Sequence, residues 1–268
     1  SLQAGASTIT TGGGDLELNA ATSISTNTAA QVRVTAGAGT LKILGVTSLS
    51  LGTNSFATTT GGAIDLVASG LTGTWTANLG STITSGGGAI TATATGGAWL
   101  ASTNSNFDAA GGSINLTAGT TFTLGASGDL IGNFARIQTN GAGAVTVNAG
   151  SSITANAYSQ ITTVNGNLGM SATTSFATGG FSEIKSTGSG SVNLGALTTF
   201  SLGANSIASA SAGNLSMSSG VSNTHSLIAN SNTTISAGGS VTIQGGGTVT
   251  IGGGTDTALS DALVTGGV

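Results

Sequence analysis

The stretch TISAGGSVTIQGGGTVTIGGG, residues 234–254, contains three short segments in which apolar and small polar residues alternate. In the last two segments the apolar residues are Val241 and Ile243, then Val249 and Ile251. Alternation with a period of two is typical of β-strands, and glycine between such segments is typical of sharp corners. Three strands of about eight residues each, corners included, would make one coil of about 24 residues.

The same unit recurs along the whole chain as a pair of apolar residues separated by one residue. The first members of these pairs follow one another at intervals of about 24 residues, with one longer interval between the fifth and sixth pairs. The ten pairs are Leu16/Leu18, Leu41/Ile43, Ile64/Leu66, Ile90/Ala92, Ile114/Leu116, Val145/Val147, Leu168/Met170, Val192/Leu194, Leu215/Met217 and Val241/Ile243. No segment has the 3.6-residue spacing of an amphipathic helix. We therefore predict an all-β protein, a parallel β-helix (β-solenoid) with three strands per coil and about ten coils.

A longer period of three coils is superimposed on the short one. STITTGGGDLELNA (7–20) returns as STITSGGGAITATA (81–94). The isoleucines that mark this longer period are Ile9, Ile83, Ile161 and Ile235. We predict that residues 1–268 form a single solenoid domain. Because neither end shows a polar capping element, we expect a fragment or an uncapped module.

The composition excludes several kinds of partner. Charged residues make up 4% of the 268 residues, and the formal net charge is −4. The four cations, Arg33, Lys42, Arg136 and Lys185, do not cluster, so nucleic acid is not an expected partner. There is no cysteine, which removes disulfides and thiolate metal sites, and no proline, which suits fully paired strands. Apolar runs are far shorter than a membrane span needs, so no membrane insertion is expected.

The phrase Gly-Gly-x-[Ile/Leu/Val]-x-[Leu/Val]-x-Ala occurs as GGAIDLVA (61–68) and GGSINLTA (111–118). It resembles the shaft repeats of filamentous haemagglutinin-like adhesins secreted by the two-partner route, and autotransporter passengers share the pattern. The resemblance covers nearly the whole chain. It implies a right-handed parallel β-helix, export to the bacterial surface, and adhesion or fibre building. The Asn-Pro motifs of the family's secretion domain and Arg-Gly-Asp are absent, so no binding residue carries over.

A second row of large residues is expected about eight positions after the first apolar residue of each coil. Its members are Ile24, Leu49, Phe122, Ile153, Phe176, Phe200 and Val249, with Trp99 one residue out of step. Such a row could be a sugar-binding platform, but its alternation with small polar residues favours core packing. Trp75, Tyr158 and Phe181 fall outside this row, and the pattern does not place them.

Pectin-cleaving enzymes use the same kind of solenoid, so catalysis has to be weighed. Their chemistry needs paired carboxylates, or a calcium site with a basic residue, on one wall. Asp108 and Asp129, separated by close to one coil and with Arg136 nearby, are the best candidate for such a pair. His225 is the only histidine, which is too few ligands for an ordinary metal site. We expect no enzyme, and no catalytic, cofactor-binding or metal-binding residues.

These observations favour a structural or interaction protein, the shaft of an extracellular bacterial adhesin or surface fibre. The expected partners are other copies or adjoining coils, end to end, and surface glycans or proteins. A filament subunit that stacks end to end is the alternative, and a polysaccharide-active enzyme is third. An ice-binding solenoid would need a monotonous outward column of threonine. The column here begins Glu17, Lys42, Asp65, Thr91 and is mixed over most of its length.

Overall fold

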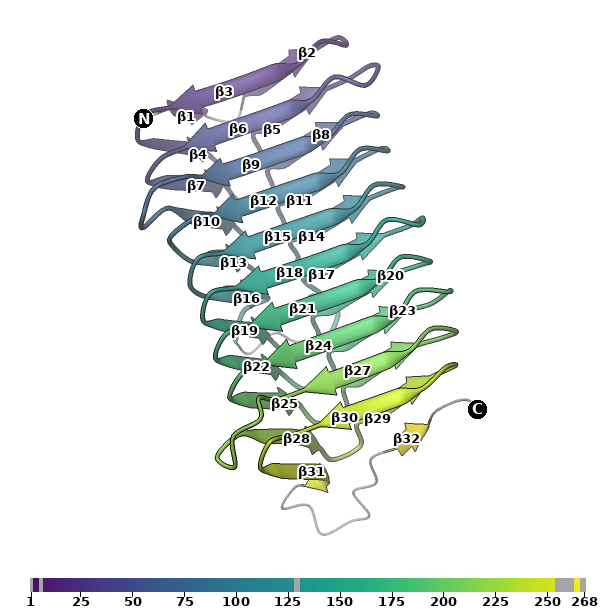
Figure 1. The fold of residues 1–268 in the computed structure, drawn as a ribbon. Helices are drawn as coiled ribbons and strands as arrows, with labels where there is room; N and C mark the ends of the chain where they lie inside the picture. Colours follow the sequence, from purple (N-terminus) through teal and green to yellow (C-terminus); the bar gives the residue numbers. More distant parts are fainter. Residues whose placement is uncertain (1, 5–6, 128–130, 254–262, 266–268) are drawn as a thin grey trace.

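The computed structural model describes residues 2–4, 7–127, 131–253 and 263–265. In these residues the chain winds into coils stacked along one axis, and each strand lies beside its equivalents in the neighbouring coils (Figure 1). The strands pair in parallel, and no helix occurs among the described residues. The predicted all-β solenoid with three strands per coil is confirmed.

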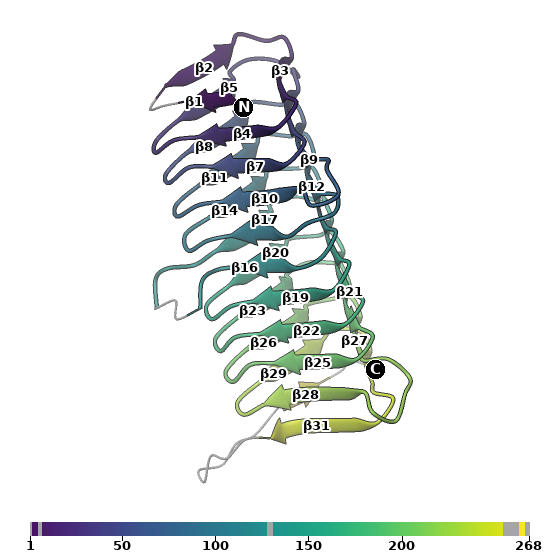
Figure 2. The ribbon, with the colours of Figure 1, turned by 90° about the vertical axis from the view of Figure 1, so that its left-hand side faces the viewer.

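The strands form three sheets, which we call walls 1, 2 and 3 in the order in which a coil visits them (Figure 2). Wall 1 consists of β3 (Leu16–Ala20), β6 (Leu41–Gly45), β9 (Ile64–Ala68), β12 (Ile90–Ala94), β15 (Ile114–Ala118), β18 (Val145–Ala149), β21 (Leu168–Ala172), β24 (Val192–Ala196), β27 (Leu215–Ser218) and β30 (Val241–Gln244). Wall 2 consists of β1 (Leu2–Ala4), β4 (Ser23–Thr26), β7 (Ser48–Leu51), β10 (Thr74–Ala77), β13 (Trp99–Ala101), β16 (Phe122–Leu124), β19 (Ser152–Ala155), β22 (Ser175–Thr178), β25 (Thr199–Leu202), β28 (Ser226–Asn230) and β31 (Thr248–Gly253). Wall 3 consists of β2 (Thr8–Thr11), β5 (Gln31–Val34), β8 (Phe56–Thr59), β11 (Thr82–Ser85), β14 (Asn106–Ala109), β17 (Arg136–Thr139), β20 (Gln160–Thr163), β23 (Glu183–Ser186), β26 (Ile207–Ala210), β29 (Thr234–Ala237) and β32 (Leu263–Thr265).

The apolar pairs found in the sequence are the inward side chains of wall 1. Ile90, for example, pairs with Ile64 of the preceding coil and with Ile114 of the next. Inward side chains are fully buried through the middle of the stack, where residues alternate between buried and partly exposed along each strand. The three-coil period is also confirmed, because Ile83 and Ile161 occupy equivalent inward positions of wall 3, three coils apart. Parallel stacking therefore turns the sequence repeat directly into columns of core side chains.

The second predicted row is the inward column of wall 2, and it also includes Trp75 and Leu227, which the sequence pattern left out. Trp75 pairs with Leu49 on one side and with Trp99 on the other. The Trp75 and Trp99 rings stack with centroids 4.9 Å apart, and Trp99 stacks on Phe122 at 4.3 Å. Both tryptophans are fully buried, and neither indole N–H has a hydrogen-bond partner. Core packing is therefore the role of this row, which we call the inner ladder.

The corner between walls 3 and 1 depends on glycine. A Cβ added to Gly166 would lie 2.0 Å from the carbonyl oxygen of Gly143 in the preceding coil. A Cβ on Gly143 would meet the carbonyl oxygen of Gly112 at the same distance. No side chain fits between backbones this close, so the second glycine of the Gly-Gly element is a steric requirement of coil stacking, whereas a Cβ on the first glycine, as at Gly111, would meet nothing within 4 Å.

The corner between walls 2 and 3 depends on a left-handed residue followed by a buried serine. Asn54, Asn104 and Asn205 have φ values of 54°, 58° and 59°, a region that asparagine tolerates better than most residues. The next residue in most coils is a buried serine whose hydroxyl donates to a carbonyl of the preceding coil. Ser182 Oγ, for example, lies 2.9 Å from the carbonyl oxygen of Asn156. Most coils are thus joined to the one before by a hydroxyl hydrogen bond as well as by the backbone.

Candidate functional site

The described charged side chains lie on walls 1 and 3 and at one corner, and the described strands of wall 2 carry none. On wall 1, Lys42 Nζ lies 3.7 Å from Glu17 Oε1 in an exposed ion pair. Asp65 follows in the same outward column. Partial burial raises the pKa of the Asp65 carboxyl, and the positive charge of Lys42 opposes this shift. Exposed pairs of this kind contribute little to stability, so we assign these three residues no function.

The carboxylate pair considered in the sequence cannot be evaluated as a pair, because Asp129 lies outside the described residues. Asp108 points outward from β14 and accepts hydrogen bonds from Gln138 Nε2 at 2.8 Å and Asn140 Nδ2 at 2.9 Å. Arg136 lies in the next coil, opposite Asn106 rather than Asp108. The carboxylate of Asp108 is therefore held in a network of side-chain amides across two coils.

A continuous polar ladder extends along wall 3 from this point. Arg136 Nε donates to Gln160 Oε1 at 3.0 Å, and Gln160 Nε2 lies 3.5 Å from Glu183 Oε2. Lys185 Nζ in turn lies 3.0 Å from Glu183 Oε1. These residues come from three successive coils and occupy adjacent outward positions. Charges of both signs are combined here, so the ladder has no strong overall sign.

Aromatic side chains lie at the corner between walls 2 and 3, directly before the strands that carry this ladder. The Tyr158 and Phe181 rings are nearly parallel, with centroids 5.1 Å apart. The Phe134 ring contacts Tyr158 edge-on at 6.3 Å. Half of the Phe181 side chain is exposed, so these rings lie on the outside of the solenoid. We call Phe134, Tyr158 and Phe181 the aromatic corner.

A pocket of about 280 Å³ adjoins the aromatic corner. Its lining residues are Asn104, Asn106, Gly132, Phe134 and Arg136. Gly132 and Phe134 belong to the connection between β16 and β17, which has more residues than its equivalents in the neighbouring coils. The buried side-chain oxygen of Asn106 has no hydrogen-bond partner. This is the place on the described surface where rings, amides, a guanidinium group and a hollow lie together.

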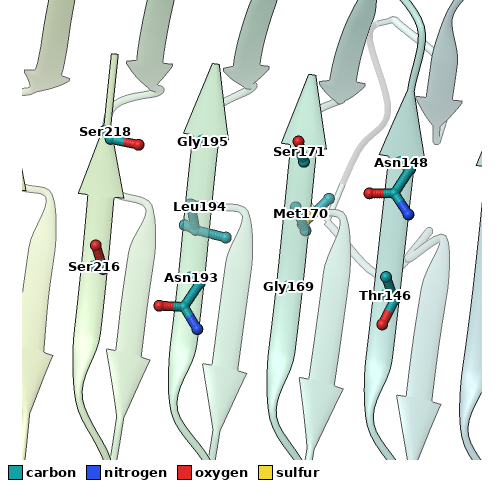
Figure 3. A pocket seen from close by; sticks show the side chains of 10 residues that line it. All are labelled: Thr146, Asn148, Gly169, Met170, Ser171, Asn193, Leu194, Gly195, Ser216 and Ser218. Atoms are coloured by element: carbon teal, nitrogen blue, oxygen red, sulfur yellow. The ribbon is translucent and has the colours of Figure 1, made fainter. Parts of the chain in front are cut away.

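A second hollow, of about 290 Å³, lies on the outer face of wall 1 (Figure 3). It extends over β18, β21, β24 and β27, where Gly169 and Gly195 replace outward side chains. Amides and hydroxyls surround it, including Asn148, Asn193 and Ser216. No ring, charged side chain or unpartnered buried atom lines it. We interpret this hollow as a gap in an outward polar column.

His225 lies in the corner before β28, where its Nδ1 accepts a hydrogen bond from the backbone N–H of Ser222 at 3.3 Å. In the ranges that the structure describes, no three His, Cys, Asp or Glu side chains are grouped so that they could hold a metal ion. Nor does the described part of the chain contain a helix long and apolar enough to cross a membrane.

Sequence reasoning placed Asp108 and Arg136 close together but missed the aromatic corner. Tyr158 and Phe181 could have been found by aligning each coil on its corner serine, because they occupy the position that Asn54, Asn104 and Asn205 occupy in other coils.

In comparisons with known proteins, no family model, no curated protein and no solved structure matches the chain.

Proposed function

We propose that this protein is the rigid shaft of an extracellular bacterial adhesin or surface fibre, of the filamentous haemagglutinin-like kind, and that it is not an enzyme. The observation that carries the proposal is the unbroken stack of coils. Wall 1 continues from β3 to β30 without a missing strand, and wall 2 continues from β1 to β31. A solenoid of this kind keeps its ends at a fixed separation, which is the mechanical task of a shaft.

The surface supports the same proposal. Outward positions are mostly Ser, Thr, Asn and Gly, and the whole chain has only twelve Asp, Glu, Lys and Arg residues. Hydroxyls and amides keep such a surface hydrated without long flexible charged side chains. The strands of the middle coils are paired on both sides, which leaves few locally unfolded segments for proteases to cleave. These properties suit a protein that has to persist outside the cell.

Antibody labelling of cells that produce the chain tests this proposal. Antibodies raised against the purified chain should bind to intact cells, and electron microscopy should place the label away from the membrane. Labelling that appears only after the cells are permeabilised would contradict an extracellular shaft. An antibody against a cytoplasmic protein of the same cells is the control for membrane integrity.

A filament subunit that joins end to end is a second candidate, favoured by the last described coil. Val249 and Ile251 on β31 occupy the inward column of wall 2, yet they are 43% and 40% exposed. Their partners in the preceding coil, Leu227 and Ala229, are fully buried. One further coil, from the same chain or from another copy, would cover them. Fibres in micrographs of the purified chain that are lost in Ile251→Lys would support assembly, whereas uniform short rods at every concentration would contradict it.

A further inference from the structure

Two residues of the aromatic corner, Tyr158 and Phe181, occupy backbone positions that disfavour aromatic side chains. One residue in most coils has a positive φ at the corner between walls 2 and 3: Ala29, Asn54, Gly80, Asn104, Tyr158, Phe181, Asn205 and Asn232. Glycine and asparagine tolerate this conformation, whereas a bulky residue there is an outlier. Tyr158 and Phe181 both have a φ of 61°. Because the fold is satisfied by Asn or Gly in the neighbouring coils, local backbone preference does not explain the two rings, and such outliers concentrate at functional sites.

The rings combine with the polar ladder into one surface. Asn106, Arg136, Gln160 and Glu183 are paired in register as the first outward column of wall 3, immediately after the aromatic corner. Tyr158 covers one face of the Phe181 ring, and the next corner residue, Asn205, contributes no ring. Half of the Phe181 side chain is exposed, and the pocket at Asn106 and Phe134 lies at the other end of the row. Apolar rings and hydrogen-bonding groups thus run side by side over successive coils.

The chemistry of this surface selects one class of ligand. Nucleic acid requires a net positive surface, but Arg136 and Lys185 are accompanied here by Asp108 and Glu183. A peptide that binds by strand addition requires a free sheet edge, and β17, β20 and β23 are each paired on both sides. A sugar presents apolar C–H faces that pack on aromatic rings, and hydroxyls that both donate and accept hydrogen bonds. Amides, guanidinium and carboxylate together supply both partners for those hydroxyls.

We propose that the aromatic corner and the adjoining column from Asn106 to Glu183 form an oligosaccharide-binding site. The Phe181 ring and the pocket at Phe134 receive pyranose rings, and Asn106, Arg136 and Gln160 hydrogen-bond their hydroxyls. The site belongs to the middle coils and does not depend on whether the protein is a surface shaft, so it can be tested on the purified chain.

The decisive experiment replaces the rings with the residue that the fold uses elsewhere at this corner. Tyr158→Asn/Phe181→Asn should keep the β-sheet circular dichroism spectrum and the thermal midpoint, because asparagine suits the left-handed backbone. Isothermal titration with cellohexaose, xylohexaose and chitohexaose should show binding of at least one of them to the wild-type chain. The double variant should bind that sugar at least tenfold more weakly. Asn54→Gly, a change at an equivalent corner far from the rings, is the matched control and should bind normally.

A second variant keeps the test decisive if the corner variant does not fold. Gln160→Ala removes only an outward amide between Arg136 and Glu183 and should also weaken sugar binding, again without changing the circular dichroism spectrum. The proposal is overturned if none of the three hexasaccharides binds to the wild-type chain. It is also overturned if a folded Tyr158→Asn/Phe181→Asn or Gln160→Ala protein binds with wild-type affinity. Failure here leaves the shaft proposal intact, because cell-surface labelling does not depend on sugar binding.

Discussion

The protein has one aromatic ladder inside the solenoid, on wall 2, and aromatic rings on its outer surface, at the corner between walls 2 and 3. In the inner ladder, Trp75, Trp99 and Phe122 stack in the core, and the backbone there is ordinary extended strand. In the aromatic corner, Tyr158 and Phe181 also stack, with centroids 5.1 Å apart, but they are outside, and the backbone is left-handed. Packing requires the first set, whereas nothing in the packing requires the second. The comparison separates side chains that hold the solenoid together from side chains that it displays.

Truncation of the inner ladder should have the largest effect on stability. Trp99→Ala removes a fully buried ring that contacts Trp75, Phe107 and Phe122. We expect a loss of about 3–5 kcal/mol in the free energy of unfolding, measured by denaturant titration. Trp99→Phe is the control, since it keeps a ring and removes an indole N–H that has no partner. A loss below about 1 kcal/mol for Trp99→Ala, far less than a buried ring normally contributes, would show that the inner stack is not what holds these coils together.

A pair of glycines three positions apart tests the same distinction between inside and outside. Gly166→Val places side-chain atoms against the backbone of Gly143 and should destabilise the protein by about 3 kcal/mol. Gly169→Ser adds a side chain on the outer face of wall 1, where nothing lies within 4 Å of a built Cβ. We expect this second change to alter stability by less than about 0.5 kcal/mol. Thermal unfolding of the two variants compares them, and equal losses would contradict the assignment of the faces.

The serine behind the aromatic corner should matter more for folding than the ring in front of it. Ser182→Ala removes the buried hydroxyl that binds the Asn156 carbonyl and should cost about 1 kcal/mol. Phe181→Asn should change stability by less, because relief of about 1–2 kcal/mol of backbone strain offsets a lost stacking contact of about 0.5–1.5 kcal/mol. The denaturant midpoints of the two variants show which substitution destabilises the protein more. If Phe181→Asn instead destabilised the protein more than Ser182→Ala does, the outer rings would be structural.

The smallest effect concerns the charge of Asp65 on the outer face of wall 1. Because burial raises the pKa of this carboxyl in the folded state, its contribution is favourable below the ordinary pKa of aspartate and is lost as the pH rises through the raised value. Asp65→Asn should therefore raise the unfolding midpoint slightly at pH 7 and leave it unchanged at pH 3. The gain in the free energy of unfolding at pH 7 should be less than ~1 kcal/mol, because the site is partly exposed. Thr91→Asn, in the same column of the next coil, is the uncharged control. A larger midpoint gain at pH 3 than at pH 7 would reverse the assigned direction.

The sequence was sufficient for the core wherever corner length is constant. The apolar pairs of wall 1 and most of the inner ladder follow from counting residues, because each coil repeats the register of the one before. Trp75 was missed because the corner between β9 and β10 is longer than the assumed spacing, so a fixed offset of eight residues ends at Thr72. Tyr158 and Phe181 could not be placed by an apolar pattern, since they are apolar residues that face outward. Hydrophobic periodicity identifies buried positions and carries no information about rings that are displayed.

The parallel stacking also determines the sequence separation between residues that contact each other in the folded protein. Paired residues such as Ile114 and Leu116 contact positions one coil away, which is a short separation in a chain of 268 residues. That separation is about a tenth of the chain length, a value usual for helical bundles rather than for β-sandwiches. An all-β protein with this connectivity can form from one end by adding a coil to an existing edge, as fast as each new segment becomes available.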